Sequence, residues 1–110
     1  MKIPNASNAV VDIRKLRAYC LNHEHRLGKH KARLFDSQLG LTVDDAEVLQ
    51  SWLRSIVKSE NAELGDKDSH GQRYQIMAIM QWAGKSATIL SAWIVRPAEG
   101  FPDLITCYPI

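Results

Sequence analysis

The chain has 110 residues, of which 45% are hydrophobic and 24% charged, and its formal net charge is +2 at pH 7. This is the composition of an ordinary small globular protein, so we expect residues 1–110 to form a single domain. No apolar run has transmembrane length and no signal peptide opens the chain, so we expect a cytoplasmic protein that does not contact membranes.

The first half of the chain predicts three helices. Their expected ranges are residues 13–21, 29–39 and 43–58, each with apolar side chains at helical spacing. Asp12 is a good N-cap for the first helix. Gly40 is a suitable residue to end the second helix. The third helix has the most marked apolar stripe, and it begins with a Thr-x-x-Asp sequence typical of a capping box.

From residue 73 the apolar side chains alternate, which predicts strands. The expected strands are residues 73–82, 87–95 and 104–108, and the intervening segments read as turns. Short connections predict an antiparallel meander. Apolar residues occupy both phases of the first two strands, so we expect a well-covered sheet with the helices on one face.

The fold class is therefore α+β, with about three N-terminal helices packed on a C-terminal antiparallel sheet of three or more strands. Residues 59–72 are polar, contain two Gly and predict a flexible loop; a small extra strand would come from this loop or from residues 1–8. Cys20 and Cys107 lie far apart without a CxxC pattern, and we expect both to be buried free thiols.

Residues 23–33 combine side chains that can exchange a proton near neutral pH with side chains that can bind an anion. They hold three of the four histidines together with two Lys and two Arg. Gly28 divides this stretch into a loop and the start of the second helix, where backbone N–H groups and the helix dipole favour an anion. The acidic residues gather instead in residues 42–68, an asymmetry that fits an anionic ligand on the N-terminal side. The alternative is a solvated basic helix face.

Several kinds of site find no support in the sequence. No His, Cys or carboxylate spacing is typical of a metal site, and no P-loop or GxSxG motif occurs, so we expect neither a metal nor a cofactor. The remaining chemistry is metal-independent cleavage of RNA phosphodiester bonds. Imidazole suits its acid and base steps, and Lys and Arg suit the charge of the phosphorane.

We expect His30 to be the general base or acid, with His25 as its partner. The expected catalytic set is His30, His25, Lys31, Thr106 and Tyr108, and the expected phosphate-binding set is Gly28, Lys29 and Arg33.

Several segments resemble one bacterial family. They are Pro4-Asn5-Ala6-x-Asn8-Ala9, Asp12-x-Arg14-Lys15-Leu16, Leu21-Asn22-x-Glu24-His25, Gly28-Lys29-His30-Lys31-Ala32-Arg33-x-Phe35, Ala92-Trp93-Ile94-Val95-Arg96-Pro97 and Pro102-x-Leu104-Ile105-Thr106-Cys107-Tyr108. The family consists of small domains found free-standing or as terminal modules of polymorphic-toxin and phage-related proteins. The resemblance implies similarity to ribonuclease toxins of the barnase, colicin and RelE-like type, and so an antidote protein as partner. It assigns no catalytic residues.

Two other readings remain open. The chain is alternatively a non-catalytic module that binds nucleic acid or a protein. In the simplest reading, His25 and His30 only form hydrogen bonds that organise the loop between two helices.

Overall fold

The computed structural model describes all 110 residues and confirms the expected α+β class. Short helical segments and three helices precede a four-stranded sheet in the order η1 (Ala6–Asn8), α1 (Ile13–Lys15), η2 (Leu16–Cys20), α2 (Lys29–Leu39), η3 (Val43–Asp45), α3 (Ala46–Ser59), β1 (Glu63–Asp68), β2 (Gly71–Trp82), β3 (Lys85–Val95) and β4 (Pro102–Pro109). The strand order β1-β2-β3-β4 is an antiparallel meander, as the short connections predict.

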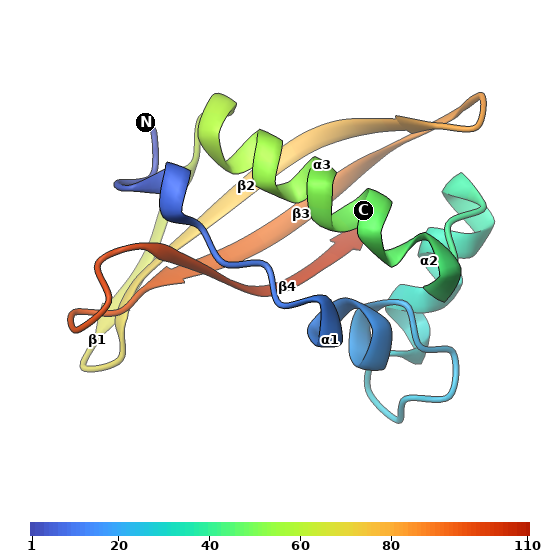
Figure 1. The fold of residues 1–110 in the computed structure, drawn as a ribbon, viewed down its shortest axis with the longest axis horizontal. Helices are drawn as coiled ribbons and strands as arrows, with labels where there is room; N and C mark the ends of the chain where they lie inside the picture. The colour runs from blue at the N-terminus through green and yellow to red at the C-terminus, as the bar shows by residue number, and fades with distance from the viewer.

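The helices lie on one face of the sheet. Helix α3 crosses in front of β2 and β3, and α1 with η2 lies beside β4 (Figure 1). One cluster of 22 buried residues draws on both layers, with Leu49 and Leu53 from α3 and Ile76, Ile89 and Trp93 from the sheet. Strands β2 and β3 contribute alternate side chains to this cluster, because successive side chains point to opposite faces.

The other face of the sheet is less covered than the sequence predicts. Met77 is 50% exposed and Ile79 is 67% exposed, both in the outward phase of β2. The helices pack on the inner face only, so apolar residues in the outward phase stay open to solvent. The expectation of a well-covered sheet is therefore wrong for this face.

Of the two segments expected to supply a small extra strand, residues 59–72 do so, and this segment is therefore not the flexible loop that its composition predicts. Strand β1 pairs with β2, and every residue of β1 is exposed. Backbone hydrogen bonds to β2 form this strand, so its side chains carry no alternating apolar pattern for the sequence to reveal. Asp68 supports the turn that follows, accepting from the His70 N–H over 2.9 Å and pairing with Arg73 over 2.8 Å.

The first helix also differs from its prediction. Helix α1 is a single turn, and the chain continues as the π-helical turn η2, closed by a Leu21 N–H to Leu16 carbonyl bond of 2.9 Å. Asp12 is the N-cap as predicted, since its carboxylate accepts from the Arg14 N–H.

The other predicted helix ends are confirmed. Gly40 ends α2 with a φ of 68°, and Thr42 with Asp45 forms the capping box before α3. No helix is both long enough and apolar enough to cross a lipid bilayer.

Candidate functional site

A shallow cleft of about 800 Å³, wide open to solvent, lies where η2 and the following loop meet the edge strand β4. It is the largest hollow of the molecule, and it is lined by Asp12, Arg14, Lys15, Ala18, Tyr19, His25, Leu27, Ile105 and Thr106. His25 and Thr106 are expected site residues, and the fold brings them together from opposite ends of the chain.

A break in the β4 ladder shapes the sheet side of this cleft. Ala92 pairs with Thr106, but the next residue of β3, Trp93, pairs with Leu104, so the register skips Ile105. A bulge of this kind bends a strand and re-aims its side chains. Ile105 and Thr106 consequently both line the cleft.

Lys31 and Tyr108 do not line the cleft, but Lys31 contacts Tyr19, which does. Its ammonium donates a 2.8 Å hydrogen bond to the Tyr19 hydroxyl, and it lies 4.9 Å from the centroid of that ring and 5.4 Å from the Tyr108 centroid. None of the ion pairs in the structure involves Lys31. The cleft therefore borders a half-buried cation that no carboxylate neutralises, held between two aromatic rings.

His25 is held by backbone donors. Its Nδ1 accepts from the N–H of Leu27 over 3.0 Å and from the N–H of Gly28 over 2.9 Å, and its ring meets Tyr19 edge-on at 4.8 Å. A neutral imidazole has one acceptor nitrogen and one N–H, so this arrangement puts the proton on Nε2. His25 thus offers a donor to a ligand, while its acceptor is already occupied.

Gly28 was expected to bind phosphate, and the structure shows the partner of its backbone N–H and its packing. The N–H expected to bind an anion is used by His25. The position matters instead for close packing, because a Cβ atom there would lie 2.2 Å from the carbonyl oxygen of Tyr19. Only glycine lets the start of α2 approach η2 this closely.

The structure does not bring the remaining predicted residues into the cleft. Helix α2 buries Ala32, Phe35 and Leu39, and the helical repeat places His30 and Arg33 on the opposite, exposed side. Lys29 flanks this outer face and, like His30 and Arg33, lines no part of the cleft. The basic stretch is therefore split, with Lys31 alone directed toward Tyr19 and Tyr108.

Both cysteines are buried and free, as predicted. A hydrogen bond from the Cys107 thiol, helped by Thr106 and the Lys31 charge and opposed by burial, lowers the pKa of Cys20 to about 7. The same contact and burial raise the pKa of Cys107 well above its ordinary value. The Thr106 hydroxyl is buried without a partner at normal hydrogen-bond distance, although it lies close enough to influence Cys20.

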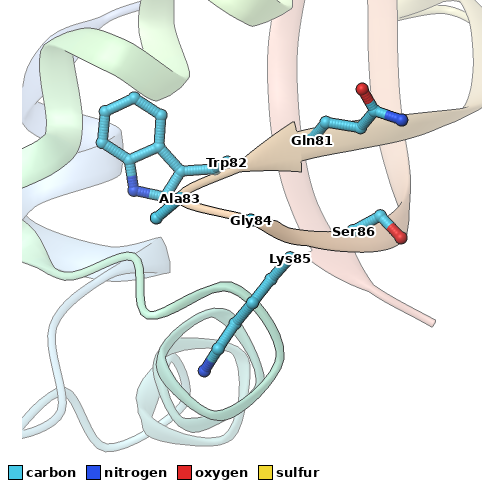
Figure 2. A pocket seen from close by; sticks show the side chains of 6 residues that line it. All are labelled: Gln81, Trp82, Ala83, Gly84, Lys85 and Ser86. Atoms are coloured by element: carbon cyan, nitrogen blue, oxygen red, sulfur yellow. The ribbon is translucent and has the colours of Figure 1, made fainter.

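A second hollow, of about 480 Å³, lies at the tip of the β2–β3 hairpin. Figure 2 shows Trp82 and Lys85 on one side of the turn and Gln81 and Ser86 on the other. Lys85 is the only charged residue among its lining, so this hollow lacks the convergent polar groups of a binding site.

The expected site residues left out most of the cleft lining, including the polar side chains of Lys15 and Tyr19. Lys15 lines the cleft while its ammonium donates to the Leu104 carbonyl over 2.8 Å. Tyr19 lies beside the predicted apolar stripe, so spacing alone marked it as a flanking core residue. The only feature of the sequence that could have marked Tyr19 as a cleft residue is its position next to Cys20.

Comparisons with known proteins give the following relationships. No curated protein matches the sequence. The structure is similar to a chain of a contact-dependent growth inhibition toxin–immunity protein complex from Klebsiella pneumoniae 342, with a TM-score of 0.69 and 21% sequence identity over 94% of this chain and 95% of that chain. This likeness shows a shared fold. Residues 2–110 match the family described as domain of unknown function DUF6883, and the chain belongs to that family.

Proposed function

We propose that the chain is a toxin-like domain that binds RNA in the cleft between η2 and β4 and cleaves its phosphodiester bonds without a metal. The observation that carries this proposal is the position of Lys31. Its ammonium lies beside the cleft between Tyr19 and Tyr108 and has no carboxylate partner. A half-buried cation of this kind attracts an anion more strongly than one in open solvent.

The cleft offers complementary groups to a phosphodiester. Lys31 would stabilise the negative charge that grows on the phosphorane, and the neutral His25 would donate from Nε2 to a phosphate oxygen. The Tyr19 hydroxyl, held by Lys31, is the group for proton exchange with a ribose or leaving oxygen. Tyr108 flanks the Lys31 ammonium with its ring, and Thr106 shapes the wall from the sheet.

The residues on the outer face of α2 have a secondary place in this proposal. His30 and Arg33 are exposed and Lys29 flanks them. We assign to them contacts with neighbouring phosphates of a longer RNA, which add affinity without sequence preference.

One observation favours a second candidate, a non-catalytic module that binds nucleic acid or a protein. The Nδ1 atom of His25 is used by two backbone N–H groups, and Asp12, the one carboxylate lining the cleft, is paired with Arg14 over 2.9 Å. Neither group is a free general base. Binding needs only the donors and the cation, whereas cleavage also needs Tyr19 to exchange a proton.

The structural neighbour supports a place in a toxin system, because it belongs to a toxin–immunity protein complex. We therefore propose an antidote protein as the partner of this chain. We also propose that the domain acts in the bacterial cytoplasm, where RNA would be its target.

The decisive experiment incubates purified protein with several RNAs in EDTA and compares Lys31→Met with His30→Gln on the same helix. We expect cleavage by the wild type and by His30→Gln, and loss of cleavage in Lys31→Met. If His30→Gln loses cleavage and Lys31→Met keeps it, the catalytic site lies on the outer face of α2 instead. Salt-sensitive RNA binding without cleavage would support the non-catalytic binding module instead. If the protein neither binds nor cleaves RNA, RNA is not its ligand.

A further inference from the structure

We propose that the open outer face of the sheet, the face turned away from α3 (Figure 1), is the interface of a homodimer. A second copy of the chain would pack on this face about a two-fold axis parallel to the strands. The apolar side chains of the outer face are Met77, Ile79, Leu90, Ala92, Ile105 and Tyr108. The proposal does not depend on the RNA-cleaving function.

The middle of the outer face is apolar and open to solvent. Met77 is 50% exposed and Ile79 is 67% exposed, and Leu90 and Tyr108 are half-buried. Met77 pairs with Leu90, and Leu90 pairs with Tyr108, so these three side chains form one row across β2, β3 and β4. A contiguous apolar patch on a small protein is typical of an interaction surface.

The two rims of the outer face carry opposite charges. Strand β1 contains three acidic residues and one lysine, and neither Glu63 nor Asp66 belongs to an ion pair. On the opposite rim, beside β4, Lys15 and Lys31 have no carboxylate partner either. A partner of a single charge would match only one of these rims.

A second copy matches both rims at once. Rotation about an axis parallel to the strands places β1 of each copy over β4 of the other, because the strand order is β1-β2-β3-β4. The acidic rim of each copy then meets the basic rim of the other, and the interface is isologous.

The same rotation matches the apolar row. It places β2 of each copy over β3 of the other, and Met77 and Leu90 lie at the same height because they are paired. Met77 of each copy therefore meets Leu90 of the other. Two sheets with roughly aligned strands are a common packing, with about 10 Å between the sheets.

The size of the face fits a dimer that dissociates on dilution. With a rise of about 3.3 Å per residue and a strand spacing of about 4.8 Å, the four strands cover roughly 600 Å². Two copies would bury roughly 1,200 Å² in total, which is the low end of the range for specific interfaces. We therefore expect a reversible dimer and not an obligate one.

Sedimentation velocity, from low micromolar to near-millimolar protein, tests the proposal. We expect the average mass to rise with concentration from the 12.4 kDa of one chain toward twice that value. A chain that stays monomeric at the highest concentration would overturn the proposal and leave the outer face to a different protein.

A charge in the middle of the face tests where the copies meet. Ile79→Glu should weaken dimerisation at least about tenfold, because the new carboxylate would be buried without a partner. Val43→Glu is the matched control, since Val43 is 43% exposed but lies on η3 in the helix layer. This variant should dimerise like the wild type. Equal effects of the two substitutions would overturn the placement of the interface.

A charge reversal tests the rims. Glu63→Lys should weaken dimerisation several-fold, because the lysine would face the basic rim of the other copy. Glu60→Lys makes the same change in net charge outside the sheet and should have no effect. If both variants dimerise equally, the match of the rims is wrong. Circular dichroism checks that each variant is folded. Because the readout is mass, failure of RNA cleavage leaves this result unaffected.

Discussion

Lys31 on α2 donates a 2.8 Å hydrogen bond to the hydroxyl of Tyr19 on η2, and this contact joins two segments separated by the whole basic loop. It fixes the ammonium beside the cleft. A half-exposed hydrogen bond contributes little to the free energy of unfolding. We therefore expect this contact to matter more for RNA binding and cleavage than for stability.

Tyr19→Phe tests that contact. The variant keeps the ring that packs against His25 and Lys31 but removes the hydroxyl. We expect RNA cleavage, or RNA affinity if the domain only binds, to fall roughly tenfold, with a change in the free energy of unfolding of about 1 kcal/mol or less. RNA assays and urea denaturation measure the two effects. Tyr74→Phe, on β2 outside the cleft, is the control and should leave RNA activity unchanged.

Substitutions of His25 separate its two nitrogen atoms. Asn places an acceptor near the position of Nδ1 and has no group at Nε2, so His25→Asn should keep the bonds from Leu27 and Gly28 and lose the donor to the ligand. We expect near-normal stability and weakened RNA binding. His25→Ala leaves both N–H groups unpaired and should also destabilise the protein by about 1–3 kcal/mol. Equal stability of the two variants would contradict the role of Nδ1.

Gly28→Ala tests the close approach of α2 to η2. The new Cβ would lie 2.2 Å from the backbone oxygen of Tyr19, which cannot move without shifting η2. We expect destabilisation of about 2–4 kcal/mol, measured by urea or thermal unfolding.

Gly40→Ala is the matched control for that change. Its Cβ would meet nothing within 4 Å, but its φ of 68° is unfavourable for alanine, so we expect a cost of only about 1 kcal/mol. A larger cost at Gly40 than at Gly28 would refute the packing argument.

Ultraviolet absorbance of the thiolate should reveal one ionisation near neutral pH. The folded protein should lose the Cys20 proton near pH 7, while an ordinary thiol, as in the unfolded chain, keeps it until about 9.0. The unfolded state then binds more protons, so stability should rise with pH between these values, by at most about 1.4 kcal/mol per pH unit, and this gain is lost as pH falls through 7.

Cys107→Ala removes the main cause of this shift and should raise the pKa of Cys20. Thr106→Val should raise it less, because its hydroxyl is a smaller contributor. A wild-type titration in which no thiolate forms below pH 8 would contradict the arrangement.

Local pattern determined much of the fold. Helical spacing, Asp12, Gly40 and the Thr42–Asp45 capping box placed the helices, and alternation placed three of the four strands, because these features act within a few residues. Strand β1 was expected only as a small extra strand from residues 59–72 or 1–8, since its pairing with β2 rather than a local pattern creates it. The π-helical form of η2 and the open outer face of the sheet likewise depend on packing.

The candidate site shows the same division. The sequence by itself determined that the histidines, lysines and arginines concentrate in residues 23–33 and that α2 begins after Gly28. Only the tertiary structure decided that Lys31 meets Tyr19 and Tyr108 while His30 faces away, because a helix separates neighbouring residues by about 100°. The influence of Cys107 on the pKa of Cys20 depends on the packing of η2 against β4, and no local pattern encodes it.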